Sequence, residues 1–463
     1  MIDRIRHGKT WINATTNRKI FAAAVLIIIC SVFARVAATV KEIAVASYFG
    51  AGDNIDAFLM AFLVPAYVIN VIGASFNAAL IPSYIRIREQ QGTASAHKLF
   101  SNVMAGCLAM LIAASVVILA GAPYYLPLVA SGFSREKVAL TGRLLCFLSP
   151  MVVLCGINTL WGAILNADRK FGLVAATPVV TPLVVILFLI SGRSDYGVYS
   201  LAIGTICGML MELILLGIAL TRKGISPWPR WYGLDSNVRQ VFRQLVPMVS
   251  GASLMCATGF IDQSMSSMLG SGSVSALSYG NKIVSALLGL SATALGTAVT
   301  PYFSTMVARR EWAEIRHTLK HYYRLIMLTS VPITIVLIFS SEPLVRLLYQ
   351  RGAFTQQNTH LVAQVQSLLA LQIPFYLAAT LTVRLISTMM ANQILVIGSI
   401  INVIVSVSLN YIFMQTMGVC GIALSTSCVY AVSFLFLYYS WRWTSRHGGT
   451  AASDDYSRRI FPK

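Results

Sequence analysis

Charged residues interrupt a stretch of sequence that is otherwise apolar enough to cross a membrane. Residues 21–50 form one apolar segment, yet they contain Arg35, Lys41 and Glu42. A charged side chain at the centre of a lipid-facing helix costs roughly 2.5–3.5 kcal/mol on insertion scales, so such residues usually face a wet cavity or a partner. We therefore expect this first apolar segment to take part in transport.

The polar residues of the first two apolar segments recur at helical spacing. Arg35 and Glu42 are seven residues apart, which places them on one face of a regular helix. The next segment begins with Asp56 and carries Asn70 and Asn77, again seven residues apart. Each segment therefore has a polar face. The alternative is that the two asparagines only bond neighbouring helices and that Asp56 caps a helix.

Further ionisable residues lie in the apolar segments of the second half, namely Asp262, Lys282 and Arg384. Together with Arg35 and Lys41, the basic residues of both halves are suited to line a cationic cavity that binds a diphosphate. Arginine offers phosphate a two-pronged donor and lysine a compact charge. The acids Glu42, Asp56 and Asp262 would then hold these cations apart in the empty cavity. The competing hypothesis is that each cation pairs with a neighbouring acid or reaches toward the membrane surface.

The elements that position these residues are transmembrane helices. With 57% hydrophobic and 11% charged residues, the chain is typical of a membrane protein. About 20 apolar residues span a bilayer as a helix, and continuous apolar runs exclude the alternation of barrel strands. We predict an all-α polytopic protein with twelve spans, at residues 21–48, 56–85, 99–122, 143–165, 173–191, 199–220, 245–269, 276–306, 323–341, 361–390, 394–415 and 418–441.

The formal charge of +19 indicates orientation rather than nucleic-acid binding. Basic clusters occur at one side of the twelve-span arrangement, within residues 4–19, 86–98, 169–170, 222–243, 309–320 and 442–463. Because cytoplasmic loops are enriched in Lys and Arg, we expect both termini to be cytoplasmic. The same clusters would contact anionic membrane lipids, and no nucleic-acid partner is expected.

Similar segments recur at a fixed distance along the chain. Pro82 and Pro301 are 219 residues apart, and Gly197 and Gly418 are 221 residues apart. Six spans per repeat give both halves the same direction, so we predict two six-helix lobes related by a parallel pseudo-two-fold axis around a central cavity. The predicted parts are a basic N-terminus (1–20), an N-lobe (21–222), an amphipathic cytoplasmic linker (223–244), a C-lobe (245–441) and a basic tail (442–463).

Four motifs make the chain resemble the MurJ/MviN lipid II flippases of the multidrug/oligosaccharidyl-lipid/polysaccharide exporter superfamily. They are FGAGDNIDAFLMAFLVP (49–65), NAALIP (77–82), SGSVSALSYGNKI (271–283) and LYQRGAFT (348–355). The resemblance implies that Arg35, Lys41 with Glu42, Asp56, a position near Asn70, and Lys282 serve the transport cavity.

The chain departs from the family pattern at several of these positions. Lys41–Glu42 stands for the usual Arg-Asp pair, Lys282 stands for an arginine, and the arginine of the second span is absent. Family members commonly have fourteen spans, so the chain would be a divergent member with about twelve. Lysine lacks the two-pronged geometry of arginine at a phosphate, so the departures leave room for another lipid-linked saccharide as cargo.

We accordingly predict a transporter rather than an enzyme. It would move a polyprenyl-pyrophosphate-linked saccharide, with lipid II first, from the cytoplasmic to the outer leaflet of a bacterial inner membrane by alternating access. The alternatives are an exopolysaccharide or O-antigen repeat-unit flippase and a cation-coupled multidrug exporter. No catalytic residue, cofactor or metal site is expected, and the protein is predicted to be a monomer. Membrane potential or a coupled cation would drive the cycle.

Overall fold

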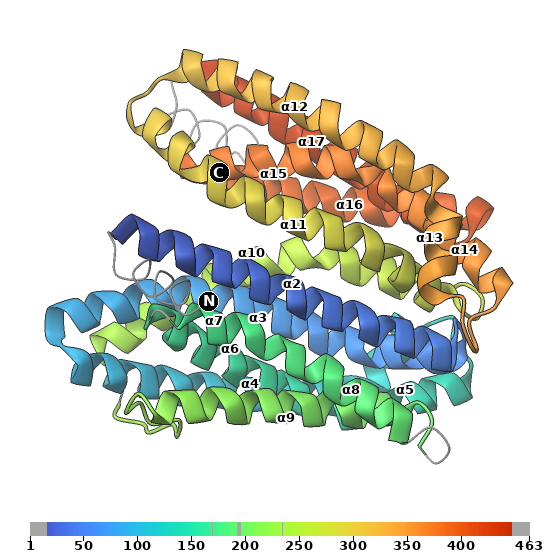
Figure 1. Cartoon of the computed structure of the whole chain (residues 1–463), viewed down its shortest axis with the longest axis horizontal. Helices are drawn as coiled ribbons and strands as arrows, with labels where there is room; N and C mark the ends of the chain where they lie inside the picture. Colours follow the sequence, from blue (N-terminus) through green and yellow to red (C-terminus); the bar gives the residue numbers. More distant parts are fainter. Residues whose placement is uncertain (1–15, 169, 192–195, 234, 447–463) are drawn as a thin grey trace, which may run out of the picture. The chain divides into compact units, whose positions relative to one another are not determined.

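The computed structural model describes residues 16–168, 170–191, 196–233 and 235–446 (Figure 1). All regular elements in these ranges are helices, and no β-strand occurs among them. The predicted all-α class is therefore confirmed. Most of the predicted basic N-terminus and of the basic tail lies outside the described residues.

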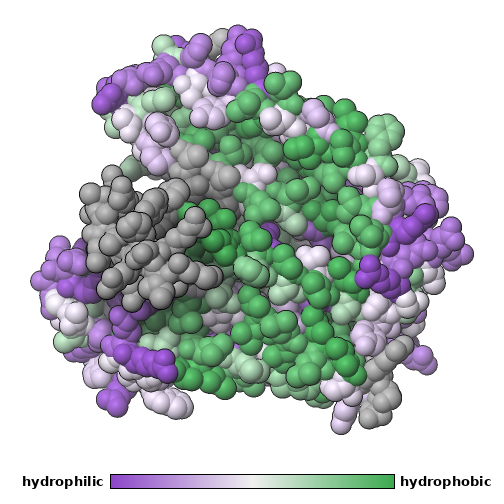
Figure 2. Space-filling view, viewed as in Figure 1, coloured by the Kyte–Doolittle hydropathy of each residue, from purple (hydrophilic) through white to green (hydrophobic). Residues whose placement is uncertain are grey.

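Ten helical segments of the described residues are long and apolar enough to cross a membrane. They correspond to ten of the twelve predicted spans. The other two predicted spans, 21–48 and 276–306, fall on the long helices α2 (Thr16–Phe49) and α11 (Ser273–Ala308). On the face shown in Figure 2, hydrophobic residues cover the middle of the helices and hydrophilic residues gather at helix ends. This pattern is the one a bilayer requires, because the hydrocarbon layer solvates only apolar side chains.

The chain forms two compact units that are interleaved in sequence. Unit 1 comprises Met1–Tyr48, Ala61–Tyr124 and Ala139–Ala252, and unit 2 comprises Phe49–Met60, Tyr125–Val138 and Ser253–Lys463. The predicted lobes were continuous in sequence, whereas residues 49–60 and 125–138 belong to the second unit. The parallel pseudo-two-fold axis and the limits of the predicted lobes stay predictions.

Unit 1 contains α2 and the helices that follow it as far as the start of α10, some of them only in part. They are α3 (Asp53–Gln91), α4 (Thr93–Val129), α5 (Arg135–Leu148), α6 (Pro150–Ala167), α7 (Phe171–Ala176), the short 3-10 helix η1 (Thr177–Val179), α8 (Val180–Ser191), α9 (Tyr199–Thr221) and the start of α10 (Ser236–Ser266). Pro178 lies in η1, where it removes a backbone donor and tightens the turn between α7 and α8. The core of this unit joins α3, α4, α6 and α9 through buried side chains such as Phe100 and Leu160. Val238 and Val241 of α10 are buried in the same core, so the amphipathic start of α10 packs on this unit.

Unit 2 contains α11 and the remaining helices of the chain. They are α12 (Trp312–Phe339), α13 (Ser341–Tyr349), α14 (Gln356–Ala370), α15 (Gln372–Thr388), α16 (Asn392–Met417) and α17 (Val419–Arg446). Its core includes Val284, Val365 and Leu381, which are fully shielded from solvent. Gly50 has a positive φ of 61° and packs so closely on Ala353 that a Cβ would lie 2.5 Å from its carbonyl oxygen. Two motifs that carry the family resemblance, FGAG and RGAF, are thus in direct contact.

Candidate functional site

Three charged residues lie in the apolar part of α2, and two of them form an ion pair. Lys41 Nζ lies 2.8 Å from Glu42 Oε1, and both side chains are largely buried. Arg35, two turns earlier, is exposed on the helix surface and makes no ion pair with any described residue. An arginine in this position on an apolar helix requires water or an anion to solvate its charge.

The polar face predicted for α3 is described only in part. Asn70 lies on α3 and is exposed. Asn77 lies on the same helix, but its side chain is outside the described residues. The prediction that both asparagines bind substrate therefore stays a prediction.

Asp56 is a buried acid of unit 2 with both charged and backbone partners. Its carboxylate accepts hydrogen bonds from the backbone N–H groups of Gly272 and Ser275, each at 2.8 Å, and pairs with Lys137 Nζ at 3.0 Å. Gly272 and Ser275 are the N-cap and the third residue of α11, whose first N–H groups have no partner within the helix. Asp56 therefore caps α11 from another part of the chain, which is one of the two roles considered from the sequence.

Lys282 and Arg384 both present exposed side chains on helices of unit 2. Lys282 lies in the third turn of α11. Arg384 lies on α15, and its guanidinium packs over Gly296 of α11, where a Cβ would lie 3.1 Å from Nη2. The absence of a side chain at position 296 thus leaves room for the arginine. Among the described residues Arg384 forms no ion pair.

Asp262 of α10 is buried and is bonded entirely by neutral groups. It is 8% exposed. One carboxylate oxygen accepts from Asn410 Nδ2 at 2.7 Å and from Ser406 Oγ at 3.1 Å, and the other accepts from Thr426 Oγ1 at 2.9 Å. No basic side chain of the described residues pairs with it. Because burying an unpaired carboxylate is costly, this arrangement needs a further positive partner when the acid is ionised.

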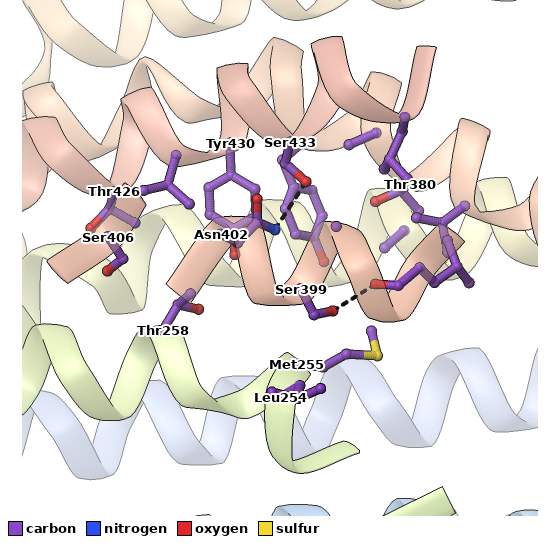
Figure 3. A pocket seen from close by; sticks show the side chains of 18 of the residues that line it. Leu254, Met255, Thr258, Thr380, Ser399, Asn402, Ser406, Thr426, Tyr430 and Ser433 are labelled. Atoms are coloured by element: carbon purple, nitrogen blue, oxygen red, sulfur yellow. Dashed lines mark hydrogen bonds between the residues drawn. The ribbon is translucent and has the colours of Figure 1, made fainter. Parts of the chain in front are cut away.

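Asp262 and Arg384 line one cavity of about 440 Å³ inside unit 2 (Figure 3). Ser406 and Thr426 lie at one end of the cavity in this view and Thr380 lies at the other. Asn402 donates a hydrogen bond to Ser433 at 3.1 Å in the wall between them. A carboxylate therefore stands near one end of a mainly apolar chamber and an arginine also borders it.

The oxygen atoms around Asp262 fit a small hard cation. Asn410 Oδ1 is buried and has no hydrogen-bond partner among the described residues, and Asn402 Oδ1, in the wall of the cavity, has none either. Carboxylate, amide and hydroxyl oxygens are the ligands that hard cations prefer. The described residues contain no group of three or more His, Cys, Asp or Glu side chains suited to a transition metal.

Sequence reasoning missed the partners that define both acidic sites. Lys137 lies outside the predicted spans and is 81 residues from Asp56, so no local pattern in the sequence joins the two. Ser406 and Asn410 are spaced i,i+4 on α16, so a polar face on that span was visible in the sequence. Thr426 carried no signal of its own, since threonine is common in membrane helices and bonds its own backbone.

The comparisons with known proteins decide the family. The family model described as "Lipid II flippase MurJ" matches residues 45–452. The chain belongs to this family. A curated MurJ relative, the "Probable lipid II flippase MurJ" of Rickettsia prowazekii (strain Madrid E), is 24% identical over 90% of this chain and 83% of its own length.

Two solved structures share the fold of this MurJ family member. "Lipid II flippase MurJ, inward closed conformation" matches with a TM-score of 0.79 at 23% identity, over 90% of this chain and 87% of that chain. A "multidrug resistance MATE family transporter of the MOP superfamily" in an inward-facing conformation matches with a TM-score of 0.73 at 14% identity, over 92% and 98%. The resemblance seen in the sequence is confirmed, and the family is one of transporters rather than enzymes. The polysaccharide and drug-export alternatives are not favoured.

Proposed function

We propose that this protein is a lipid II flippase, which moves the lipid-linked peptidoglycan precursor from the cytoplasmic to the outer leaflet of the bacterial inner membrane. The observation that carries the proposal is the match of the lipid II flippase MurJ family model to residues 45–452. Relatives of the same printed name align over most of the chain. The chain is a multi-pass membrane protein, and the basic clusters favour cytoplasmic termini.

The basic residues on the apolar helices bind the diphosphate of the cargo in this proposal. These residues are Arg35, Lys41, Lys282 and Arg384. Arg35 and Arg384 support the assignment, because both are exposed and neither makes an ion pair with a described residue. Their charge is therefore available to a phosphate oxygen. Asn70 and Asn77 would bond the saccharide, and Glu42 keeps Lys41 in place between transport events.

Asp262 is the coupling residue of the proposed cycle. A monovalent cation bound by Asp262 and Asn410 would neutralise the buried carboxylate and leave the hydroxyls of Ser406 and Thr426 to complete its oxygen shell. Binding and release of that cation shift the equilibrium between two states of the unit only if the two states hold it with different affinity. Membrane potential adds about 2.3 kcal/mol per elementary charge per 100 mV to such a cycle.

Complementation in cells depleted of their own lipid II flippase tests this proposal. We expect the chain to restore growth and the exposure of lipid II on the outer leaflet, whereas Arg35→Ala and Lys282→Ala fail at equal membrane abundance. Arg346→Ala is the matched control, because Arg346 is an exposed arginine whose partner is Glu342, four residues away. Absence of rescue by the wild-type chain would contradict the function. Full rescue by both the Arg35 and the Lys282 variants would contradict the assignment of these two cations to the cargo.

A further inference from the structure

A second cavity lies in unit 1, and none of the residues of the transport proposal lines it. It has a volume of about 350 Å³ and forms where the start of α4 meets the segment that joins α9 to α10. His97 and Lys98 line it from α4, and Arg230 and Tyr232 line it from the connecting segment. None of its lining residues is acidic. The cavity is in the size range of small-molecule sites, about 300–1,000 Å³.

The connecting segment is held against α4 by its backbone. Ser101 Oγ accepts from the Arg230 N–H at 2.7 Å and donates to the Arg230 carbonyl at 3.0 Å. Asn102 accepts from the Tyr232 N–H at 2.5 Å and donates to the Gly233 carbonyl at 3.1 Å. Because the backbone is fixed at these points, the cavity is formed before any ligand arrives, and the side chain of Arg230 carries no share of the anchoring.

The aromatic residues of the same segment indicate the depth of the cavity in a membrane. Trp228 and Trp231 are 76% and 53% exposed, and Tyr232 is 52% exposed. Large aromatic side chains with a polar edge concentrate at the level of lipid head groups. The apolar spans of α4 and α9 end at this segment as well. A lipid head group is therefore the molecule that reaches this cavity most readily.

The chemistry of the lining matches a phosphate. Arg230 supplies a two-pronged donor, and Lys98, whose Nζ lies 5.5 Å from the centre of the Tyr232 ring, supplies a compact charge. Ala94, in the first turn of α4, lines the cavity too, and the first N–H groups of a helix favour an anion. Arg86 and Arg88 lie near the end of α3, which precedes the start of α4 in the chain, but they do not line the cavity: Arg86 bonds Gln240 and Arg88 pairs with Asp168.

We propose that this cavity binds the phosphate head group of an anionic phospholipid of the surrounding leaflet. The bound lipid would contact both the start of α4 and the segment before α10, which are already joined by hydrogen bonds. The inference does not depend on what the protein transports.

A lipid titration of the purified full-length protein in neutral detergent tests the proposal. Bound lipid is counted by native mass spectrometry with phosphatidylglycerol and with phosphatidylcholine as probes. We expect the double variant Lys98→Gln/Arg230→Gln to weaken phosphatidylglycerol binding about 25-fold, because each basic residue near an anionic surface contributes about fivefold. The control Arg239→Gln/Arg243→Gln removes the same charge from exposed residues of α10 that do not line the cavity and should bind like the wild type.

Each remaining outcome decides for or against the proposal. Equal binding by the two double variants, or equal affinity of the wild type for phosphatidylcholine, would overturn it. Displacement of phosphatidylglycerol by millimolar inorganic phosphate would show an ion site instead of a lipid site. A loss confined to polyprenyl diphosphate would assign the cavity to the cargo. If Lys98→Gln/Arg230→Gln lowers the melting temperature, the charge-conserving Lys98→Arg/Arg230→Lys replaces it and must bind phosphatidylglycerol within a fewfold of the wild type.

Discussion

Asp56 and Asp262 are two buried acids of the same unit with opposite surroundings. Asp56 is fully shielded and has an ammonium and two backbone N–H groups as partners. Asp262 is almost as deeply buried, yet its partners are two hydroxyls and one amide. The first acid has all the charge compensation that it needs within the fold. The second acid has no basic partner in the part of the chain that the structure describes.

This difference separates a structural acid from a functional one. Removing one member of a buried ion pair leaves an uncompensated charge and is strongly destabilising. Burying an ionised carboxylate without a basic partner costs free energy, and neutralising it removes that cost. A buried acid of this kind therefore needs a reason other than stability. For Asp262 that reason is the proposed exchangeable cation. The variants below test this contrast, from the largest expected change in free energy to the smallest.

Asp56→Asn should cost the most stability. The change removes the buried carboxylate that pairs with Lys137, whose side chain is 10% exposed, and leaves it paired with the exposed Asp53, so we expect the free energy of unfolding to fall by about 3 kcal/mol. Denaturant unfolding of the purified protein in detergent measures this loss. Glu342→Gln, which breaks an exposed pair with Arg346, is the control and should change stability by about 0.5 kcal/mol or less. Equal effects of the two changes would remove the structural role of Asp56.

Asp262→Asn should leave the fold intact and abolish cation dependence. We expect transport to fall about fivefold to 150-fold, since a coupling free energy is typically about 1–3 kcal/mol, and we expect the residual rate to be independent of Na⁺ concentration. The measurement is lipid II transport in vesicles at varied Na⁺ and constant ionic strength. Glu212→Gln is the control, because it removes another membrane carboxylate, whose partner is Thr181 at 2.6 Å. Wild-type rates and Na⁺ dependence in Asp262→Asn would assign coupling elsewhere.

Thr426→Ala tests the oxygen shell proposed around the same cation. Loss of one neutral oxygen ligand should raise the Na⁺ concentration for half-maximal transport about fivefold to tenfold. A contact as strong as a hydrogen bond contributes about 1 kcal/mol to binding. Thr380→Ala alters a threonine of the same cavity that does not bond Asp262 and should leave that concentration unchanged. A shift of the same size in both variants would show a general effect on the cavity.

Asp53→Asn should have the smallest effect. Asp53 accepts from Lys137 Nζ at 2.6 Å, but its side chain is 64% exposed, so we expect a loss of unfolding free energy below about 1 kcal/mol. The same denaturant unfolding measures it. A loss of unfolding free energy as large as that of Asp56→Asn would mean that both acids stabilise Lys137 equally. The burial of Asp56 would then add nothing to the stability of the pair.

The sequence predicted the fold more fully than the site. The spans follow from length and hydropathy alone, and the helices of the described residues fall on all twelve predicted segments. The ends of these helices were harder to predict. Helices α4 and α12 extend by a turn or more beyond the predicted apolar run, with polar residues that are also common in loops. Residues 49–60 and 125–138 belong to unit 2 because of contacts between distant segments, such as Gly50 with Ala353. No local pattern in the sequence encodes such contacts.

In the candidate site, too, the sequence identified the charged residues but not their partners. Asp262, Arg384 and Arg35 were recognisable because a charge inside an apolar run is costly wherever it lies. The roles of the acids depend on their partners. Asp56 and Gly272 are 216 residues apart, and Asp262 and Asn410 are 148 residues apart, so the distinction between a cap and a cation ligand required the folded chain.

The most direct test of the account is the transport of lipid II by the purified protein in sealed vesicles. Fluorescent lipid II is placed in one leaflet, and its appearance in the other is followed with the wild type, with Arg35→Ala and with Lys282→Ala. The account predicts rapid transport by the wild type and transport at the rate of protein-free vesicles by both variants. Wild-type vesicles that move lipid II no faster than protein-free vesicles would contradict it.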